Sequence, residues 1–241
     1  GRHSAVRARA GLVVEELGAP MAVLWFRLSR RPGDPADPVG RFERGHIFIM
    51  LNRGDSWQCG FVIAKGTRTQ LQAKGLGAFR ESVARLAPFA ADRVGEIQDW
   101  DPIKLLTVQV DRLQQWLRPG LLCIGDAAHA MSPVGGVGIN LAIQDAVAAA
   151  NILAAPLREG RVTFDHLRRV QQRREWPTRM TQRMQLFLQD RVINPVLREA
   201  GPLTPPLPLR LLARFPSLQR IPARLIGIGF RPEHVRTPVA S

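Results

Sequence analysis

The stretch Leu121–Ala146, LLCIGDAAHAMSPVGGVGINLAIQDA, decides the fold class of this chain. Its four opening apolar residues, Leu121–Ile124, predict a short strand that is covered on both faces, as in a parallel sheet. The strand ends at Gly125, and Asp126 places a carboxylate where open α/β sheets bind ligands. After a Gly-rich loop, Asn140–Leu157 has the small and apolar residues of a closely packed helix. The sequence therefore predicts a ligand site between strand and helix.

Two features of this stretch indicate what it would bind. The carboxylate can accept hydrogen bonds from sugar or polyol hydroxyls. The glycines let the backbone approach a ligand, and the N–H groups at the start of the following helix favour negative charge. A dinucleotide fingerprint is a weak match, because Leu141 replaces the third small residue and about ten residues separate Gly136-Val137-Gly138 from its strand.

The segments GDAAH at 125–129 and SPVGGVGINLAIQDA at 132–146 resemble the second FAD-binding motif of flavoprotein aromatic hydroxylases, the group typified by p-hydroxybenzoate hydroxylase. The resemblance implies that Asp126 contacts the ribityl or ribose hydroxyls. It also implies that the backbone at the helix start contacts the flavin pyrimidine edge and that Pro133 lines the flavin and substrate site. The implied cofactor-binding residues are Gly125, Asp126, Pro133, Gly136, Gly138, Ile139, Asn140 and Arg7.

Arg7 belongs to a second, weaker match. The opening residues GRHSAVR resemble the tail of the family's D-G-x-x-S-x-x-R motif, with Gly1, Ser4 and Arg7 in place. The leading Asp and the family's N-terminal GxGxxG are absent from the sequence. We therefore expect the C-terminal part of such an enzyme, with half of the FAD site, that binds FAD poorly by itself.

The implied activity is that of an FAD-dependent monooxygenase. It would use NADH or NADPH and oxygen to hydroxylate an aromatic or unsaturated apolar substrate through a flavin hydroperoxide. A related flavoenzyme (a halogenase, an epoxidase or a prenyl-chain reductase) and a truncated, non-catalytic remnant remain as alternatives. No residue stands out as a general base. A triad of Asp126, His129 and Ser132 is disfavoured because no G-x-S-x-G elbow is present, and His129 is expected to be a packed, hydrogen-bonded histidine.

The expected fold is of the α/β class, with a partial Rossmann-like FAD-binding domain, an inserted, mostly antiparallel β substrate domain and a helical C-terminal region. The expected boundaries are 1–18 (FAD-binding domain), 19–110 (substrate domain), 111–160 (second FAD motif) and 161–241 (helical region and tail). Within them the patterns predict strands at 21–29 and 103–110, a hairpin of 46–52 and 57–65, a helix at 77–91 with Phe79, Val83 and Leu86 on one stripe, and a helix break near Pro177.

The composition is that of a globular protein, with 45% apolar and 22% charged residues among 241. No apolar run approaches the roughly 20 residues of a membrane span, and no leader is visible, so we expect a cytoplasmic protein. Cys59 and Cys123 are expected to be buried free thiols. The absence of a Cys/His cluster in the sequence argues against zinc.

The net charge of +14 comes from 34 basic and 20 acidic residues. The arginines are spread along the chain with few aromatics between them, which is typical of a solvated surface and does not favour nucleic acid. The Pro- and Arg-rich tail, 201–241, is expected to hold packing helices, with membrane-surface contact disfavoured. The expected partners are a small apolar or aromatic substrate and oxygen, and nothing indicates an oligomeric state.

Overall fold

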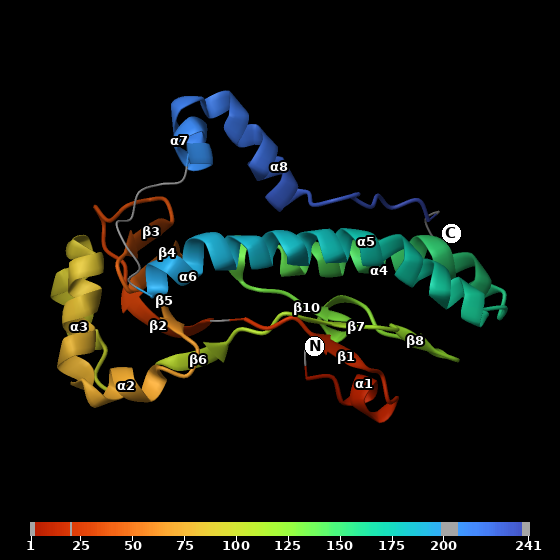
Figure 1. Cartoon of the computed structure of the whole chain (residues 1–241), viewed down its shortest axis with the longest axis horizontal. Helices are drawn as coiled ribbons and strands as arrows, with labels where there is room; N and C mark the ends of the chain where they lie inside the picture. The colour runs from red at the N-terminus through yellow and green to blue at the C-terminus, as the bar shows by residue number, and fades with distance from the viewer. Residues whose placement is uncertain (1–2, 20, 199–206, 238–241) are drawn as a thin grey trace. The chain divides into compact units, whose positions relative to one another are not determined.

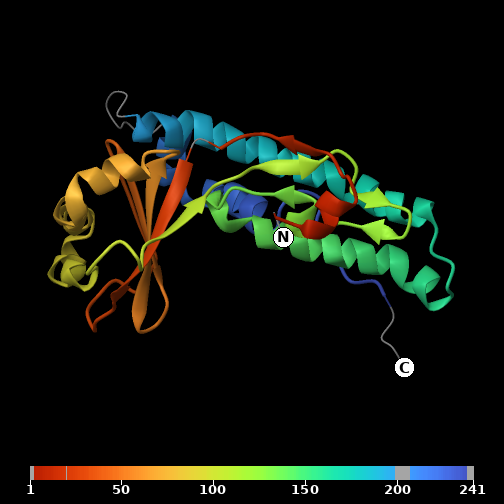
Figure 2. The same ribbon diagram turned by 90° about the horizontal axis from the view of Figure 1, so that it is seen from below.

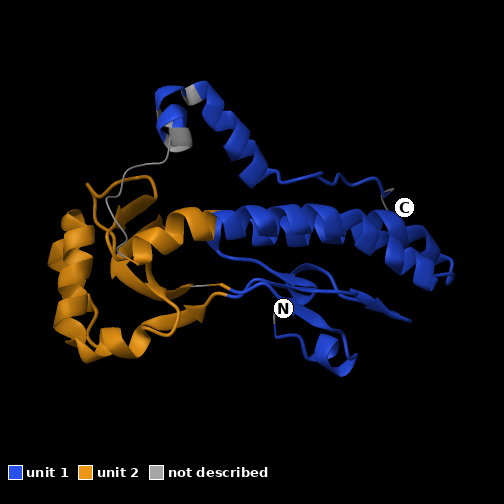
Figure 3. Cartoon of the chain, viewed as in Figure 1, with its two compact units in different colours: residues 1–18, 109–187, 205–241 blue, residues 19–108, 188–204 orange. Residues whose placement is uncertain are grey.

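The computed structural model describes residues 3–19, 21–198 and 207–237. The chain divides into two units by its internal contacts (Figure 3). Unit 1 comprises residues 1–18, 109–187 and 205–241, and unit 2 comprises residues 19–108 and 188–204. Because unit 1 is assembled from three separate segments, unit 2 is largely an insertion within it (Figure 1).

Unit 2 is built on a five-stranded antiparallel sheet with the order β3-β4-β5-β2-β6. The helices that accompany this sheet are α2, α3 and the 3-10 helix η1, and the chain returns to unit 2 through the π-helical η4 and the short α6. The bounds are β2 Met21–Ser29, β3 Val39–Glu43, β4 His46–Asn52, β5 Ser56–Ala64, α2 Arg68–Ala73, α3 Gly75–Leu86, η1 Pro88–Glu96, β6 Lys104–Thr107, η4 Gln189–Ile193 and α6 Asn194–Leu197.

The predicted hairpin is confirmed by β4 and β5, which pair from Ile47↔Val62 to Asn52↔Trp57. Its turn is closed by the Arg53 amide, which donates to the Ser56 carbonyl at 2.9 Å. Gly54 occupies the left-handed region with φ +89, a conformation that glycine adopts without steric cost. The strand predicted at 21–29 is β2 with the same bounds. The strand predicted at 103–110 is shorter, because the ladder between β6 and β2 ends at Ala22↔Thr107, where the chain leaves unit 2.

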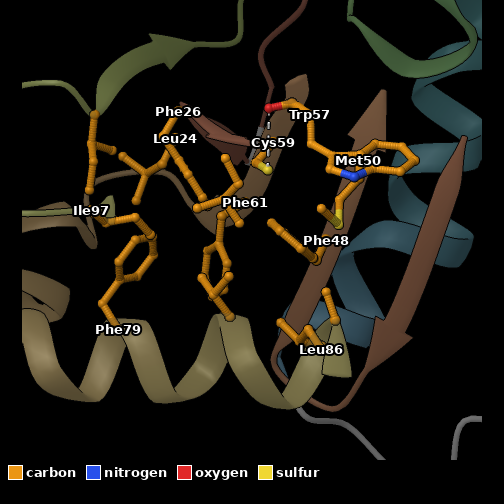
Figure 4. Packing of buried hydrophobic residues seen from close by; sticks show 14 of the residues in the cluster. Leu24, Phe26, Phe48, Met50, Trp57, Cys59, Phe61, Phe79, Leu86 and Ile97 are labelled. Atoms are coloured by element: carbon orange, nitrogen blue, oxygen red, sulfur yellow. Dashed lines mark hydrogen bonds between the residues drawn. The ribbon is translucent and has the colours of Figure 1, made fainter. Parts of the chain in front are cut away.

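The core of unit 2 lies between one face of the sheet and α3 with η1 (Figure 4). Strand alternation sends Leu24 and Phe26 of β2 into this core, whereas Trp25 faces the other side of the sheet. The helix contributes the predicted stripe of Phe79, Val83 and Leu86, all buried. The aromatic residues of the sheet divide in the same way: Phe48, Trp57 and Phe61 are core residues, and Trp25 is half-buried.

Both cysteines are buried free thiols, as expected. Burial raises the pKa of Cys59 to about 12, and burial also raises the pKa of Cys123. A neutral, inaccessible thiol is a poor nucleophile. These cysteines therefore act as small apolar core residues.

Unit 1 contains a three-stranded antiparallel sheet with the order β1-β7-β10, a short β8-β9 ribbon and two long helices, α4 and α5 (Figure 2). Its remaining elements are α1 near the N-terminus and α7, η5 and α8 in the tail. The bounds are α1 Ala5–Arg9, β1 Val14–Glu16, β7 Asp111–Leu113, β8 Leu117–Arg118, β9 Leu121–Leu122, η2 Gly125–Ala127, β10 His129–Ala130, η3 Val134–Gly136, α4 Gly138–Arg158, α5 Phe164–Leu188, α7 Leu207–Arg214, η5 Pro216–Gln219 and α8 Arg220–Gly227.

Two predictions for this unit are wrong in detail. The strand expected at Leu121–Ile124 is limited to Leu121–Leu122, and it pairs antiparallel with β8. The break expected at Pro177 does not occur, because α5 continues through this buried proline to Leu188. Gln182 and Gln185 of α5 donate hydrogen bonds to the backbone of neighbouring segments. These bonds offset the backbone hydrogen bond that Pro177 cannot donate. The expected mixture of helices and antiparallel sheet is nevertheless confirmed among the described residues.

Two apolar segments differ from their expected environment. By length and composition alone, Val134–Arg158 could cross a membrane, and 22% of its most apolar 18-residue stretch is buried in the structure. One such helix is weak evidence for a membrane span, and the buried, ion-paired Asp145 lies within this segment. In the tail, where packing was expected, Leu211, Phe215 and Ile221 are 46%, 51% and 69% exposed.

Candidate functional site

The segment between β9 and α4 forms a tight turn followed by an open loop. Gly125 begins the 3-10 turn η2 with φ +58, and a Cβ built at this position would lie only 3.0 Å from the Cβ of Ala142 in α4. The glycine thus permits both the left-handed backbone and close contact between turn and helix. Because Gly125 contacts α4, the next residue, Asp126, also lies beside this helix.

Four of the eight residues expected to contact the cofactor are exposed, whereas Gly125 and Arg7 are buried. Asp126 is exposed and its carboxylate has no hydrogen-bond or ion-pair partner among the described residues. Pro133 and Gly136 are exposed, and a Cβ on Gly136 would meet open space. Ile139, in the first turn of α4, is 68% exposed. The loop therefore offers a free carboxylate and accessible backbone over a short stretch of chain.

The N-terminus of α4 is not capped by a side chain. The first backbone N–H of the helix with a described acceptor is that of Leu141, which donates to Val137 O at 3.2 Å. The preceding N–H groups of Gly138, Ile139 and Asn140 remain available, and the helix dipole adds partial positive charge there. The Asn140 side chain is engaged, because its Nδ2 donates to Gly227 O at the end of α8 at 3.1 Å. A Cβ built at Gly138 would lie 3.4 Å from the Cβ of Met131, so the helix start lies close to the loop before it.

The second acidic residue of the motif, Asp145, is buried inside unit 1. Its Oδ2 accepts hydrogen bonds from Gly125 N at 3.0 Å and from His129 Nε2 at 2.6 Å, and its Oδ1 accepts from Arg174 Nε at 2.9 Å. Burial by itself would raise the pKa of Asp145, but these donors hold it below its usual range. Asp145 therefore fixes the start of the turn from inside, and His129 is the packed, hydrogen-bonded histidine that was expected.

Arg7 lies beside the turn η2, and its guanidinium already has partners within the protein. Its Nη1 lies 3.5 Å from Asp111 Oδ1 and donates to the carbonyl of Ala127 at 3.4 Å. Ser4 caps the short helix that carries Arg7, accepting from the Arg7 amide at 3.2 Å. The structure thus brings Arg7 next to the residue that follows Asp126, with Asp111 as a partner that sequence patterns did not indicate.

Two glutamines of α5, Gln182 and Gln185, bond to the backbone of the motif and of β7. The sequence patterns did not predict this role. Gln185 accepts from Ser132 N at 3.1 Å and donates to Ser132 O and Val134 O at 2.8 and 2.9 Å. Gln182 donates to Asp111 O at 2.8 Å and to Ala130 O at 3.3 Å. A repeated Gln at helical spacing was the available signal, but polar residues on one helix face are usually solvent-exposed.

The chemistry of these groups suits one end of a flavin nucleotide. An exposed carboxylate accepts from ribityl hydroxyls, and an uncapped helix start stabilises the negative charge of a reduced flavin ring. Gly136 leaves the space that a ring or chain would need. Among the described residues, no group of three or more metal-ligating side chains is found. The eight residues implied by the resemblance all lie in unit 1, and the structure brings them to this turn and loop.

Comparisons with known proteins identify the family of the chain. The sequence model of the FAD binding domain matches residues 1–184. The chain is 30% identical over 98% of its length to 6-methylpretetramide 4-monooxygenase of Streptomyces rimosus, and 39% identical over 72% to 3-demethoxyubiquinol 3-hydroxylase of Escherichia coli. It covers 56% and 44% of these two relatives, so it spans about half the length of the curated relatives it matches.

Solved structures share the fold at lower sequence identity. A probable FAD-dependent monooxygenase from Pseudomonas aeruginosa, PqsL, superposes with a TM-score of 0.67 at 20% identity, over 83% of this chain and 55% of that one. The aromatic hydroxylase CabE from angucycline biosynthesis gives 0.61 at 20% identity, over 95% and 45%. The fold is therefore that of FAD-dependent hydroxylases. The chain belongs to the FAD-binding domain family of FAD-dependent monooxygenases and hydroxylases.

Proposed function

We propose that this chain supplies the flavin-ring half of the cofactor site in an FAD-dependent monooxygenase that hydroxylates an aromatic or unsaturated apolar substrate. The observation that carries the proposal is the exposed Asp126 carboxylate in a turn that packs against α4, together with the uncapped start of that helix. The named activities of the relatives, a 6-methylpretetramide monooxygenase among them, support the reaction class. Bound FAD would supply the redox and oxygen chemistry, with NADH or NADPH as reductant.

The chain's own residues would bind and orient the cofactor. Asp126 would accept hydrogen bonds from the ribityl or ribose hydroxyls, and the N–H groups of Gly138, Ile139 and Asn140 would hold the pyrimidine edge. Pro133 and Gly136 would border the ring. Asp145 and Gln185 would not contact the cofactor. Asp145 positions the turn at Gly125, and Gln185 positions the loop at Ser132.

The test is flavin retention by the full-length protein. We expect that protein to purify yellow and Asp126→Ala to lose flavin, with at least a tenfold rise in Kd, because a charge-assisted hydrogen bond contributes roughly 1.5–3 kcal/mol. Asp37→Ala, an exposed aspartate of unit 2, is the control. Undiminished flavin binding by Asp126→Ala would contradict the assignment.

Product analysis with NADPH and oxygen separates the reaction classes. A monooxygenase consumes one oxygen molecule for each hydroxylated product, a halogenase also requires halide, and a prenyl-chain reductase consumes no oxygen. A single-site hydroxylated product with matching oxygen consumption is the outcome we expect.

We also propose a cytoplasmic location.

A further inference from the structure

Helix α7 of the tail exposes apolar side chains beside a pair of arginines. Leu211 and Phe215 lie four residues apart, and the Phe215 amide donates to the Leu211 carbonyl at 2.9 Å. Residues with this spacing lie on the same face of a helix. Their side chains are 46% and 51% exposed. Arg210 and Arg214, which directly precede them in sequence, are exposed as well, so the arginines border the apolar face on one side.

Helix α8 repeats this pattern. Ile221 is 69% exposed, and Ile228, seven residues later, is 45% exposed. Residues seven apart also share one face of a helix. Arg220 and Arg224 are both exposed and are one turn apart. Each of the two helices therefore has exposed apolar residues next to two exposed arginines.

The opposite side of α8 is attached to the rest of unit 1. Ile226 faces the loop before α4, because a Cβ built at Gly135 would lie 3.5 Å from its Cγ2. Asn140 Nδ2 donates to the carbonyl of Gly227, at the end of α8, at 3.1 Å. Ile221 lies about 140° around the helix from Ile226, at roughly 100° per residue, so its side chain points away from this attachment.

The charge of the tail helices has one sign. The sequence contains no Asp or Glu from Ala200 to Pro232, a stretch with five arginines. The next acidic residue, Glu233, is paired with Arg173, and its side chain is only 6% exposed. The arginines of α7 and α8 therefore have no acidic neighbour in their own segment.

We propose that the exposed side of α7 and α8 binds an anionic membrane surface. We define this tail surface by its four apolar residues and its four arginines: Leu211, Phe215, Ile221, Ile228, Arg210, Arg214, Arg220 and Arg224. Helices that are apolar on one side and basic on the other lie in the plane of a membrane interface. The long arginine side chains reach the lipid phosphates while the apolar residues enter the acyl region. The inference goes beyond the proposed function and requires no flavin.

Charge complementarity favours this partner over two others. Joining two copies of the chain through the tail surface would bring their arginines together with no carboxylates between them, and like charges repel. Nucleic acid would pair with the arginines, but single strands also need aromatic stacking, and Phe215 is the one aromatic residue of the tail surface. An anionic bilayer matches both the charge and the apolar residues. The exposure of these residues thus favours a surface contact over the packing that the sequence predicted.

Sedimentation of the full-length protein with lipid vesicles tests the proposal. Vesicles that mix phosphatidylglycerol with phosphatidylcholine should bind the protein roughly tenfold more tightly or better than vesicles of phosphatidylcholine alone. Added salt should weaken this binding without abolishing it, because salt screens the arginines and leaves the apolar contribution in place. Equal binding to the two kinds of vesicle, or binding to neither, would overturn the proposal.

Substitutions locate the contact. Arg214→Gln should weaken binding to the phosphatidylglycerol vesicles roughly fivefold, and Ile221→Ser should weaken it roughly tenfold. The matched controls are Arg41→Gln and Phe42→Ser, at two exposed neighbours in β3 of unit 2, which should bind as wild type does. Circular dichroism checks that each variant is folded. Wild-type binding by both Arg214→Gln and Ile221→Ser would show that the vesicles bind elsewhere and would refute the proposal.

Two further measurements address the other partners. Sedimentation velocity without lipid should show no association through the tail surface, and a dimer that Ile221→Ser converts to monomer would make this surface a contact between copies. Single-stranded DNA should bind more weakly than the phosphatidylglycerol vesicles. Tighter binding of DNA that Arg214→Gln weakens and Ile221→Ser leaves unchanged would assign the arginines to nucleic acid. Either result would replace the membrane proposal.

Discussion

Single buried charges in this chain are neutralised by residues far away in sequence. In unit 2, Asp34 accepts two hydrogen bonds from Arg93, at 2.6 and 2.9 Å, and one from Trp57 Nε1 at 2.9 Å. The side chains of Asp34 and Arg93 are 7% and 2% exposed. The Arg93 guanidinium is the main reason that the pKa of Asp34 lies well below its usual range. This pair ties the loop before β3 to η1.

Asp34→Asn should lower the free energy of unfolding by about 3 kcal/mol at pH 7, because Arg93 would remain buried without its carboxylate. A depressed folded pKa stabilises the fold fully above the unfolded pKa of about 3.9, and that stabilisation is lost as pH falls towards the folded pKa. The difference from wild type should therefore shrink below about pH 4 in urea titrations. Asp37→Asn, in the same loop, should have little effect. A difference that stays constant from pH 7 to pH 3 would contradict this account.

Gly125 combines two constraints that can be measured apart. Gly125→Ala should destabilise the chain by about 2–4 kcal/mol, from the left-handed backbone and from the contact with Ala142. Gly120→Ala is the matched control, because Gly120 has φ +73 and open space around its Cβ position, so only the backbone strain remains. Thermal melts should show the larger loss for Gly125→Ala, and Ala142→Gly should restore part of it. Equal losses at the two glycines would show that the contact has no cost.

At the scale of elements, α5 is a scaffold with a polar buried face. Arg174, Gln182 and Gln185 are all fully buried, and each bonds to a different segment of unit 1. Arg174 also approaches the tail, where its Nη1 lies 3.6 Å from Glu233. The helix thus fixes the motif through hydrogen bonds to backbone and carboxylate groups.

Gln185→Met should loosen the loop in front of α4, because Ser132 would lose the partners of its N–H and C=O groups. Hydrogen exchange should become faster at 132–138 and remain unchanged in β7. Gln171→Met is the control, since Gln171 bonds to Trp116 N and Gln114 O instead. Unchanged exchange at 132–138 in Gln185→Met would mean that the loop is held by other contacts.

At the scale of the whole molecule, the candidate site accounts for only one end of FAD. In the proposed site the described residues would contact the hydroxyls and the ring, and the sequence contains no GxGxxG for the pyrophosphate. We therefore expect the 241-residue chain to bind riboflavin and FAD with similar, weak affinity in fluorescence titrations. Much tighter binding of FAD than of riboflavin would place an adenosine diphosphate site within this chain.

Local patterns determined the elements that need only local information. Alternating apolar residues predicted β2 with its observed bounds and the β4–β5 hairpin, and the stripe of Phe79, Val83 and Leu86 predicted the buried face of α3. The density of the motif at 125–146 also indicated the family. The expected domain boundaries and the roles of the individual flavin contacts remain predictions.

Only the tertiary structure decided what the polar residues do. Arg93 lies about 60 residues from its partner Asp34, and Asp111 lies more than 100 residues from its partner Arg7. The pairing of β1 with β7 and the continuity of α5 through Pro177 also depend on segments that are distant in sequence. Burying a polar group is favourable only when such a distant partner is in place. Hydrophobic periodicity is therefore readable along the chain, whereas the neutralisation of buried charge becomes visible only when the chain is folded.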